Sequence, residues 1–418
     1  MTTAVLPDAG WLISGPAARA LALLDSEGEE ARVVGGAVRN ALLGIPIGDI
    51  DIATTALPAE VMRRARKAGL KHIGTGVEHG TVTLIVDGMS IEVTTLREDV
   101  ETYGRKAKVA FGRDFARDAE RRDFTINALS VGHDGVIHDY VGGLDDLAAR
   151  RVRFIGEPAR RIAEDYLRIL RFFRIHAAYG RGEPDRAGYL ACIGGRAGLS
   201  TLSAERVRSE TIKLLTASGA AGALVAMEDA GLLLLILGGV AYRGPFAAMC
   251  DIEQAMGLPP GPMRRLAALG VAVTEDARRI AVRLKLSKAE AKSLDSMGHR
   301  WWRFADKNEA AARRRLYRVG PEPFRDRAML AWARSGVDAR SEDWLSLATL
   351  PDRWSAPRFP LRAHDFIARG VGEGPALGRI LRIAEDAWLA ADFPEGEAAV
   401  AAIADQCAAR FGGDSGAI

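Results

Sequence analysis

One stretch of the chain, VVGGAVRNALLGIPIGDIDIATTA (residues 33–56), combines two adjacent glycines with two carboxylates one residue apart. The pattern predicts a strand, a glycine turn, a helix and a second strand in close succession. In the second strand the period of two sends Asp49 and Asp51 to one face, while Ile50 and Ile52 point into a core. The stretch therefore favours an α/β domain in which both acids meet at one site.

Paired acids close to glycines are typical of phosphate chemistry. Mg²⁺ prefers one or two carboxylates together with phosphate oxygens and water, and it can activate a hydroxyl and neutralise a leaving pyrophosphate. Gly35 and Gly36 allow backbone N–H groups to approach a triphosphate, and Arg39 adds a fixed positive charge. Each of the two features, taken alone, also has an ordinary structural explanation. Gly-Gly occurs in ordinary turns, and Asp-x-Asp at the end of a buried strand is often a pair of caps or a solvated edge. The combination favours phosphoryl or nucleotidyl transfer.

A second cluster, AERRDFTINALSV (residues 119–131), has Arg121 and Arg122 next to Asp123. A polar turn that leads into a half-buried strand or helix would explain one arginine in water. Two arginines beside an acid that can orient them favour a phosphate or ribose clamp, because guanidinium presents several donors in a rigid fork.

A third cluster, RRIAEDYLRILRFFRIHAAYG (residues 160–180), predicts a single helix that stops at Gly180. Its apolar residues recur at helical spacing: Ile162, Leu167, Ile169, Leu170, Phe173 and Ile175. The charged residues take the complementary positions and form one stripe: Glu164, Asp165, Arg168, Arg171 and Arg174. For this cluster alone, a row of weak surface salt bridges is the favoured interpretation.

Taken in order, six motifs resemble the bacterial class of tRNA nucleotidyltransferases, the CCA-adding enzymes, and the related bacterial poly(A) polymerases: GGAVRN, DIDIATTA, RRDFTINA, HDYVGGLDDL, EDYLRILRFFR and LSAERVRSE. The resemblance covers about residues 33–213, with a weaker echo near residues 361–388. It implies an α/β nucleotidyltransferase head, a mixed sheet with helices, over residues 1–153. An all-α neck, body and tail would follow, with a base-reading helix within residues 154–225 and tRNA binding by residues 226–418.

The resemblance implies a role for three acids of the head. Asp49 and Asp51 match the family's catalytic, metal-binding acids, and the implied cofactor is Mg²⁺. Glu92, in SIEVTTLR, stands where a third catalytic acid could approach the metal. The chain departs from the family at Asn40, because the family usually has an acid directly after the residue that matches Arg39.

Nucleotide contacts are implied at the remaining matches. Those of the head are Gly35, Gly36, Arg39, Arg122 and Asp123. Those of the predicted helix are Asp165 and Arg168, which match the pair that reads the incoming base, together with Arg171 and Arg174.

The chemistry of the bases agrees with that pair. Cytosine and adenine each present an amino donor beside a ring acceptor, which suits an acceptor-only Asp165 next to a donor-only Arg168. Guanine and uracil have a carbonyl where the amino group would be, and a buried carboxylate rejects it. Two side chains could thus replace a nucleic-acid template.

The resemblance therefore implies template-independent addition of CCA to the 3′ end of tRNA from CTP and ATP, with release of pyrophosphate. The alternative within the family is a poly(A) polymerase that adds AMP to RNA 3′ ends. The DIDIATTA sequence and the lack of a long basic C-terminal extension favour tRNA as the substrate. An inactive RNA-binding protein would not need both acids, and nucleotide transfer to a small molecule would leave the long helical half unexplained.

A charged and weakly periodic segment, residues 96–120, separates the first motifs from the second cluster. Its composition fits a solvated surface loop. The resemblance suggests instead a mobile loop that rearranges the pocket between C addition and A addition.

Composition sets wider limits on the chain. Its 418 residues, 48% of them hydrophobic, are enough for two or three domains. No GxxxxGK[ST], HExxH or GxSxG motif occurs in the sequence, and Cys192, Cys250 and Cys407 are too dispersed for a zinc site. No segment predicts a signal peptide or a membrane span, so the expected location is cytoplasmic, without a membrane partner.

The formal net charge of +3 is small, so RNA binding must depend on local clusters among the 57 basic residues. Basic helical segments recur at residues 262–269, 311–318 and 324–335. Taken singly, such segments are more often solvated faces than RNA contacts.

Overall fold

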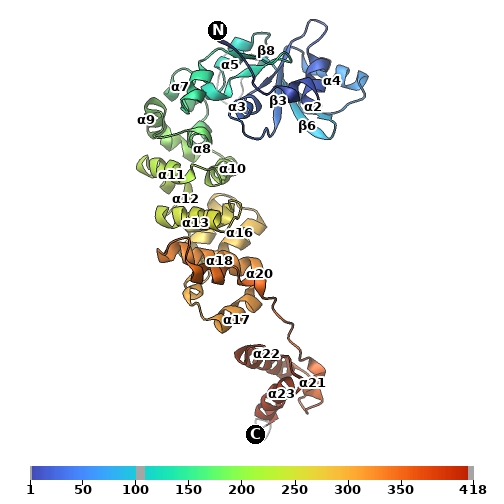
Figure 1. The fold of residues 1–418 in the computed structure, drawn as a ribbon, viewed down its shortest axis with the longest axis vertical. Coiled ribbons are helices and arrows are strands. Elements are labelled where there is room, and N and C mark those ends of the chain that lie inside the picture. Colours follow the sequence, from blue (N-terminus) through green and yellow to red (C-terminus); the bar gives the residue numbers. More distant parts are fainter. Residues whose placement is uncertain (1, 100–108, 413–418) are drawn as a thin grey trace. The chain divides into compact units, whose positions relative to one another are not determined.

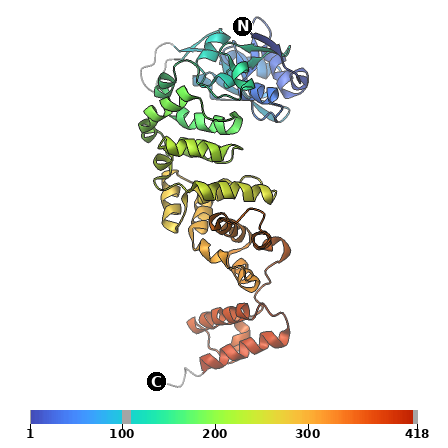
Figure 2. The ribbon, with the colours of Figure 1, turned by 60° about the vertical axis from the view of Figure 1, so that its left-hand side comes forward.

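The computed structural model describes residues 2–99 and 109–412. The chain forms two compact units, Met1–Leu235 and Ile236–Ile418. Strands and helices make up the first unit and helices the second, as the ribbon shows in Figure 1 and, after a 60° turn, in Figure 2. Within the described ranges, no helix combines the length and the apolar character needed to cross a membrane.

The first unit contains a mixed eight-stranded sheet. In spatial order its strands are β1 (Thr2–Val5), β10 (Val136–Asp139), β9 (Ser130–Val131), β2 (Ala31–Val34), β3 (Ile50–Thr54), β6 (Met89–Thr95), β5 (Thr81–Val86) and β4 (Lys71–Gly76). Strands β3 and β6 run parallel, and the other neighbouring pairs are antiparallel. The sheet and its helices confirm the predicted α/β head.

Strand β3 has the predicted alternation. Ile50 and Ile52 are buried, whereas Asp51 between them is exposed. Asp51 pairs in register with Val34 of β2 on one side and with Glu92 of β6 on the other. Because residues paired in register point to the same face of a sheet, the carboxylates of Asp51 and Glu92 lie on one face.

Six helices belong to the same part of the chain: α1 (Gly10–Ile13), α2 (Pro16–Leu24), α3 (Gly36–Leu42), α4 (Pro58–Lys67), α5 (Phe115–Glu120) and α6 (Gly143–Ala148). Helices α2 and α4 pack against the strands and against each other. Apolar residues at helical spacing, such as Leu21 and Leu24 of α2 and Val61 and Ala65 of α4, form this buried layer.

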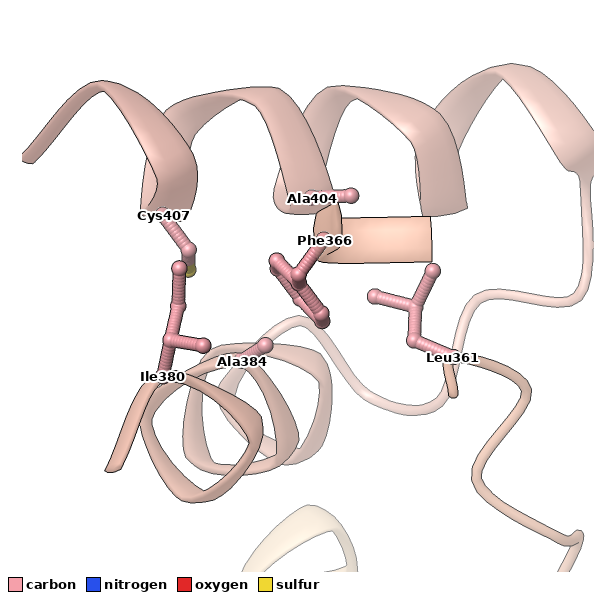
Figure 3. Packing of buried hydrophobic residues seen from close by; sticks show 6 residues of the cluster. All are labelled: Leu361, Phe366, Ile380, Ala384, Ala404 and Cys407. Carbon is pink, nitrogen blue, oxygen red and sulfur yellow. The ribbon is translucent and has the colours of Figure 1, made fainter. Parts of the chain in front are cut away.

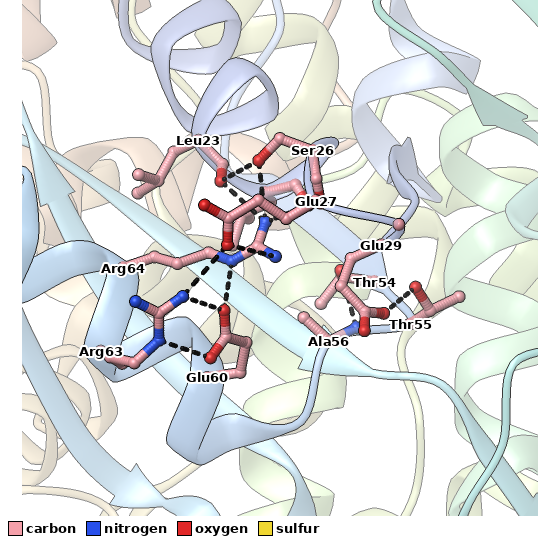
Figure 4. Close-up of polar contacts among 12 residues, drawn as sticks. Leu23, Ser26, Glu27, Glu29, Thr54, Thr55, Ala56, Glu60, Arg63 and Arg64 are labelled. Carbon is pink, nitrogen blue, oxygen red and sulfur yellow. Dashed lines mark hydrogen bonds and ion pairs between the residues drawn. The ribbon is translucent and has the colours of Figure 1, made fainter.

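Arg64 of α4 binds the end of α2. Its Nη1 donates to the carbonyl oxygens of Leu23 and Ser26 at 3.2 and 3.0 Å, and its Nε donates to Glu60 at 2.6 Å (Figure 4). The hydrogen bonds that Arg63 and Arg64 donate lower the pKa of the Glu60 carboxyl to about 2. A buried arginine thus satisfies the carbonyl oxygen of Leu23 in the last turn of α2 and that of Ser26 just beyond the helix.

A two-stranded ribbon follows β6. Strand β7 (Arg97–Asp99) pairs antiparallel with β8 (Val109–Phe111). The tip of the predicted mobile loop, residues 100–108, lies outside the described residues, so that expectation stays a prediction.

Helices follow the sheet in the first unit: α7 (Pro158–Glu164), α8 (Leu167–Tyr179), α9 (Arg186–Gly195), α10 (Ala204–Leu215), α11 (Ala220–Asp229) and α12 (Leu232–Leu237), the last of which contains the boundary with the second unit. The prediction of one continuous helix over residues 160–179 is wrong. Asp165 adopts an extended conformation, φ −155° and ψ 107°, and separates α7 from α8. The six apolar residues of the predicted helix are nevertheless all buried.

The second unit is helical: α13 (Arg243–Ala255), α14 (Pro262–Gly270), α15 (Thr274–Arg283), α16 (Lys288–Gly298), α17 (Glu309–Val319), α18 (Pro321–Ser335), α19 (Glu342–Ala348), α20 (Leu350–Arg353), α21 (Ala363–Ile367), α22 (Pro375–Ala390) and α23 (Glu397–Gly412). Helix α18 packs against α13, α14, α16, α17, α19 and α20. Its Trp332 is fully buried and stacks on Trp344. Trp332 is therefore a core residue of the second unit.

The last three helices have a small core of their own. Phe366 of α21 lies between α22 and α23, surrounded by Leu361, Ile380, Ala384, Ala404 and Cys407 (Figure 3). A second cluster joins these helices to the rest of the unit, because Trp388 and Phe393 pack against Tyr317 and Trp354.

Some of the basic residues singled out in the sequence have internal partners. Arg264 and Arg265 of α14 donate to the buried carboxylate of Glu253 at 2.9 and 2.7 Å. Arg334 of α18 lies over the rings of Tyr242 and Trp301. These arginines stabilise the helical core of the second unit.

Candidate active site

A cavity of about 620 Å³ lies in the first unit. Its wall is formed by α3, the approach to β3, the segment after α5, and helices α8 and α10. All predicted site residues except Glu92 line it: Gly35, Gly36, Arg39, Asp49, Asp51, Arg122, Asp123, Asp165, Arg168, Arg171 and Arg174. The fold thus brings the three sequence clusters to one place.

The glycine pair lies beside two guanidinium groups. Gly35 has φ 73°, a left-handed conformation that a side chain would strain. A Cβ at Gly35 would lie 3.4 Å from Nη1 of Arg122, and a Cβ at Gly36 would lie 3.5 Å from Nη2 of Arg39. The bare backbone therefore leaves room beside two cations, as an anion cradle requires.

Asp49 and Asp51 face the cavity without a cationic partner. Among the described residues, neither carboxylate has an ion pair or a side-chain hydrogen bond. Loss of solvent around Asp51 and the nearby charge of Glu92 raise the pKa of the Asp51 carboxyl, although Arg122 opposes that shift. Unpaired, crowded carboxylates of this kind favour a bound cation.

Glu92 lies beside Asp51 on β6 but does not line the cavity. In the part of the chain that the structure describes, no group of three His, Cys, Asp or Glu side chains converges into a metal site. A metal here would have two protein carboxylates and would need oxygen ligands from phosphate and water, which is the set that Mg²⁺ prefers.

Arg39 is buried, with 6% of its surface exposed. Its Nη1 donates to Oδ1 of Asn127, and its Nε and Nη2 donate to Oδ1 of Asn40 at 3.2 and 2.9 Å. Its guanidinium carbon lies 3.6 Å from the centre of the Tyr179 ring. The sequence departure at Asn40 is therefore part of the site, since the amide orients Arg39.

The arginine pair after α5 is oriented by a different acid from the one expected. Asp118, buried in α5, accepts from Nε of Arg121 at 2.8 Å and from Nη2 of Arg122 at 3.0 Å. Burial acts to raise the pKa of Asp118, but Arg122 and Arg121 outweigh it and lower that pKa below the usual value. The expectation that Asp123 orients these arginines is wrong.

Asp123 instead binds helix α8. Its Oδ2 accepts from Nε of Arg171 at 2.6 Å, and its Oδ1 accepts from the backbone N–H of Phe124 at 2.9 Å. Arg174 donates to Glu210 of α10 at 2.5 Å. These partners come from elsewhere in the fold, so Arg171 and Arg174 are not members of a surface row of ion pairs.

Asp165 and Arg168 both line the cavity but do not bond to each other through their side chains. Oδ1 of Asp165 accepts from the backbone N–H of Leu167 at 3.1 Å, and Oδ2 accepts from Nη2 of Arg206 at 2.7 Å. Nη1 of Arg168 donates to Glu164 at 2.5 Å and to the carbonyl oxygen of Arg161 at 2.7 Å. An acceptor at the break between α7 and α8 and a donor in the first turn of α8 are thus each held by other groups, and both line the cavity.

The sequence interpretation missed five residues that orient this site: Asp118, Asn127, Tyr179, Arg206 and Glu210. Arg206 and Glu210 are four positions apart in the LSAERVRSE motif, which puts them on one face of α10. That spacing was the available signal, but it does not identify their partners on another helix.

Comparison with known proteins shows similarity along most of the chain. The family profile described as Poly A polymerase head domain matches residues 31–153. The mitochondrial CCA tRNA nucleotidyltransferase 1 of Mus musculus is 35% identical over 385 residues, which cover 88% of this chain and 84% of that protein. The CCA-adding enzyme of Limosilactobacillus fermentum is 33% identical over 373 residues, which cover 88% of this chain and 90% of that protein.

Solved structures agree with the sequence relatives. The crystal structure of the Bacillus stearothermophilus CCA-adding enzyme in complex with CTP has a TM-score of 0.76 and 27% identity, and the match covers 95% of this chain and 98% of that chain. The Thermotoga maritima CCA-adding enzyme complexed with tRNA has the same fold, with a TM-score of 0.69 at 18% identity over 98% of this chain and 100% of that chain. The chain is a member of the CCA tRNA nucleotidyltransferase family.

Proposed function

We propose that this protein adds C, C and A to the 3′ end of tRNA from CTP and ATP, without a template and with release of pyrophosphate. The observation that supports this function most is the cavity itself. One side of it has two unpaired carboxylates, Asp49 and Asp51, and another side has the fixed pair of Asp165 and Arg168. The length of the match to relatives named CCA tRNA nucleotidyltransferase or CCA-adding enzyme favours this function over poly(A) synthesis.

Asp49 and Asp51 would hold Mg²⁺. A bound Mg²⁺ would activate the 3′-hydroxyl of the RNA and neutralise the charge that develops on the leaving pyrophosphate. The two residues supply hard oxygen donors from adjoining positions at the start of β3, and no side chain of the described residues competes for them through an ion pair.

The triphosphate would lie between the glycine pair and the guanidinium groups of Arg39 and Arg122. Gly36 leaves open backbone beside Arg39, and Gly35 leaves it beside Arg122. Both arginines are held by hydrogen bonds before any ligand arrives, so little side-chain freedom is lost when a phosphate binds.

The base would be read by Asp165 and Arg168. Each carboxylate oxygen has two lone pairs, so Asp165 can accept from an amino group while it keeps its bonds to Arg206 and Leu167. Arg168 retains N–H donors beyond those that bind Glu164 and Arg161. An amino donor beside a ring acceptor, as in cytosine and adenine, complements the pair.

The test offers the purified protein a tRNA transcript that lacks CCA, with each of the four nucleoside triphosphates separately and with CTP and ATP together. We expect CTP alone to add two residues, and CTP with ATP to complete CCA. A second transcript that ends in CC should accept ATP alone and add one residue. Long A tails from ATP alone would establish the poly(A) alternative, and no addition to either transcript would refute the proposal.

A further inference from the structure

Tyr179, the last residue of α8, lies against Arg39 of α3. The guanidinium carbon is 3.6 Å from the centre of the aromatic ring, which is within the range of a close cation–π contact. Arg39 lines the cavity, whereas Tyr179 does not. The ring therefore touches the face of the guanidinium plane and leaves its edge to other groups.

The other partners of Arg39 are neutral. Asn40 and Asn127 accept its N–H groups through their side-chain oxygens. Among the described residues no carboxylate forms an ion pair with Arg39. Two amides and one ring fix the position of the guanidinium without neutralising it, so its full charge remains for an anion in the cavity.

Burial makes this arrangement necessary. A charged group that is 6% exposed loses most of its hydration, which is unfavourable unless other groups replace the water. The electron-rich face of an aromatic ring compensates part of that loss, and the effect is larger where the cation is desolvated. In the absence of the ring, the guanidinium would be expected to move toward solvent and away from the glycine pair.

We propose that Tyr179 is a positioning residue that holds the Arg39 guanidinium for the triphosphate of the incoming nucleotide. This inference rests on the proposed function and adds a residue to it. Because α8 also supplies Arg168, Arg171 and Arg174 to the cavity, Tyr179 connects the phosphate side of the site to the helix on its base side.

The proposal has a specific kinetic signature. CTP and ATP have the same triphosphate. A weaker contact between Arg39 and the triphosphate must therefore affect the binding of both nucleotides equally and must not change base selection. We expect Tyr179→Leu to raise the KM for CTP and for ATP by about five- to tenfold, with the KM for tRNA unchanged. Tyr179→Phe keeps the ring and should stay within about twofold of the original protein.

The control is Tyr189→Leu, because Tyr189 is a half-buried tyrosine of the neighbouring helix α9 that does not line this cavity. Equilibrium binding of inorganic tripolyphosphate is measured alongside the kinetics, since it requires neither tRNA nor turnover. Should Tyr179→Leu fail to fold, as judged by its melting temperature, Tyr179→Met fills a similar space with a flexible side chain and replaces it.

A double-mutant cycle shows whether the effect passes through Arg39. In an Arg39→Gln background, Tyr179→Leu should produce no further loss of tripolyphosphate affinity. The inference is overturned if Tyr179→Leu leaves the KM for both nucleotides unchanged, or if its effect is undiminished without Arg39. If the original protein adds no nucleotide at all, the proposed function fails, and the tripolyphosphate measurements still decide the role of Tyr179.

Discussion

Arg206 of α10 donates to Asp165 at the break between α7 and α8, with 2.7 Å between Nη2 and Oδ2. The second oxygen of Asp165 accepts from the backbone N–H of Leu167, so both oxygens of this carboxylate are fixed. A residue proposed to read the base thus depends on a residue of another helix for its orientation. The same helix holds Arg174 through Glu210, one turn further along.

Arg206→Gln should weaken base selection while the fold persists. The loss of a charge-assisted hydrogen bond frees the Asp165 carboxylate, and we expect kcat/KM for CTP and ATP to fall by about tenfold with a measurable gain of UTP incorporation. Single-nucleotide addition with each of the four triphosphates measures this. Lys213→Gln removes an exposed cation from the same helix and is the matched control, so an equal effect of both changes would contradict the assignment.

Asp165→Ala should have the larger effect. It removes the acceptor that rewards an amino group and rejects a carbonyl, so CTP and ATP efficiency should fall while UTP or GTP incorporation becomes measurable. Combined with Arg206→Gln, it should show little additional loss, because Arg206 acts through this carboxylate. Unchanged discrimination among the four triphosphates in the Asp165→Ala protein would locate base selection elsewhere.

Asp49→Ala and Asp51→Ala should each abolish nucleotide addition, a loss of about a thousandfold or more, because the carboxylates act at the reaction centre. The dissociation constant for tRNA, measured by filter binding, should stay nearly constant, since tRNA binding is expected from residues 226–418. Glu92→Ala should retain more activity than either, because Glu92 lies beside Asp51 but outside the cavity. Robust addition by either Asp variant would remove the metal assignment.

Protonation of the Glu60 carboxyl should lower the free energy of unfolding of the head in acid. Its pKa is lowered to about 2 in the folded protein, so the unfolded chain takes up the proton more readily. The stabilisation is therefore complete above about pH 4.5 and is lost as the pH falls toward 2.

Hydrogen exchange of α2 and α4 measures this effect. We expect Glu60→Gln to weaken their protection at pH 7 by on the order of 1 kcal/mol, a value reduced by solvent around the pair. The difference between the two proteins should shrink when both are compared near pH 3. A difference that does not depend on pH would mean that Glu60 contributes through packing and not through its charge.

The sequence was sufficient to predict those features that depend only on residues close together in the chain. The alternation of Ile50, Asp51 and Ile52 is determined by strand geometry, and the burial of these isoleucines follows from it. The apolar spacing of residues 160–180 likewise identified which side chains are buried, because a helical period persists across a short break.

The break itself could not be predicted. No glycine or proline interrupts EDYL, and the extended conformation of Asp165 is stabilised by a hydrogen bond from Arg206, which is remote in sequence. The same limit applies to the arginine pair. Asp123 is the nearest acid in sequence, but Asp118, one helical turn earlier, is the acid whose side chain reaches both Arg121 and Arg122.

The buried carboxylate of Glu253 has a practical consequence for mapping the RNA surface. It holds Arg264 and Arg265, so both arginines of the basic segment 262–269 belong to an internal ion-pair network. Alanine scanning that treats this segment as an RNA contact would remove these guanidinium groups, and each removal would take one ion-pair partner from a buried carboxylate of the helical core. Weakened tRNA binding in such a variant would report unfolding of the second unit, so melting curves must accompany every affinity measured in that scan.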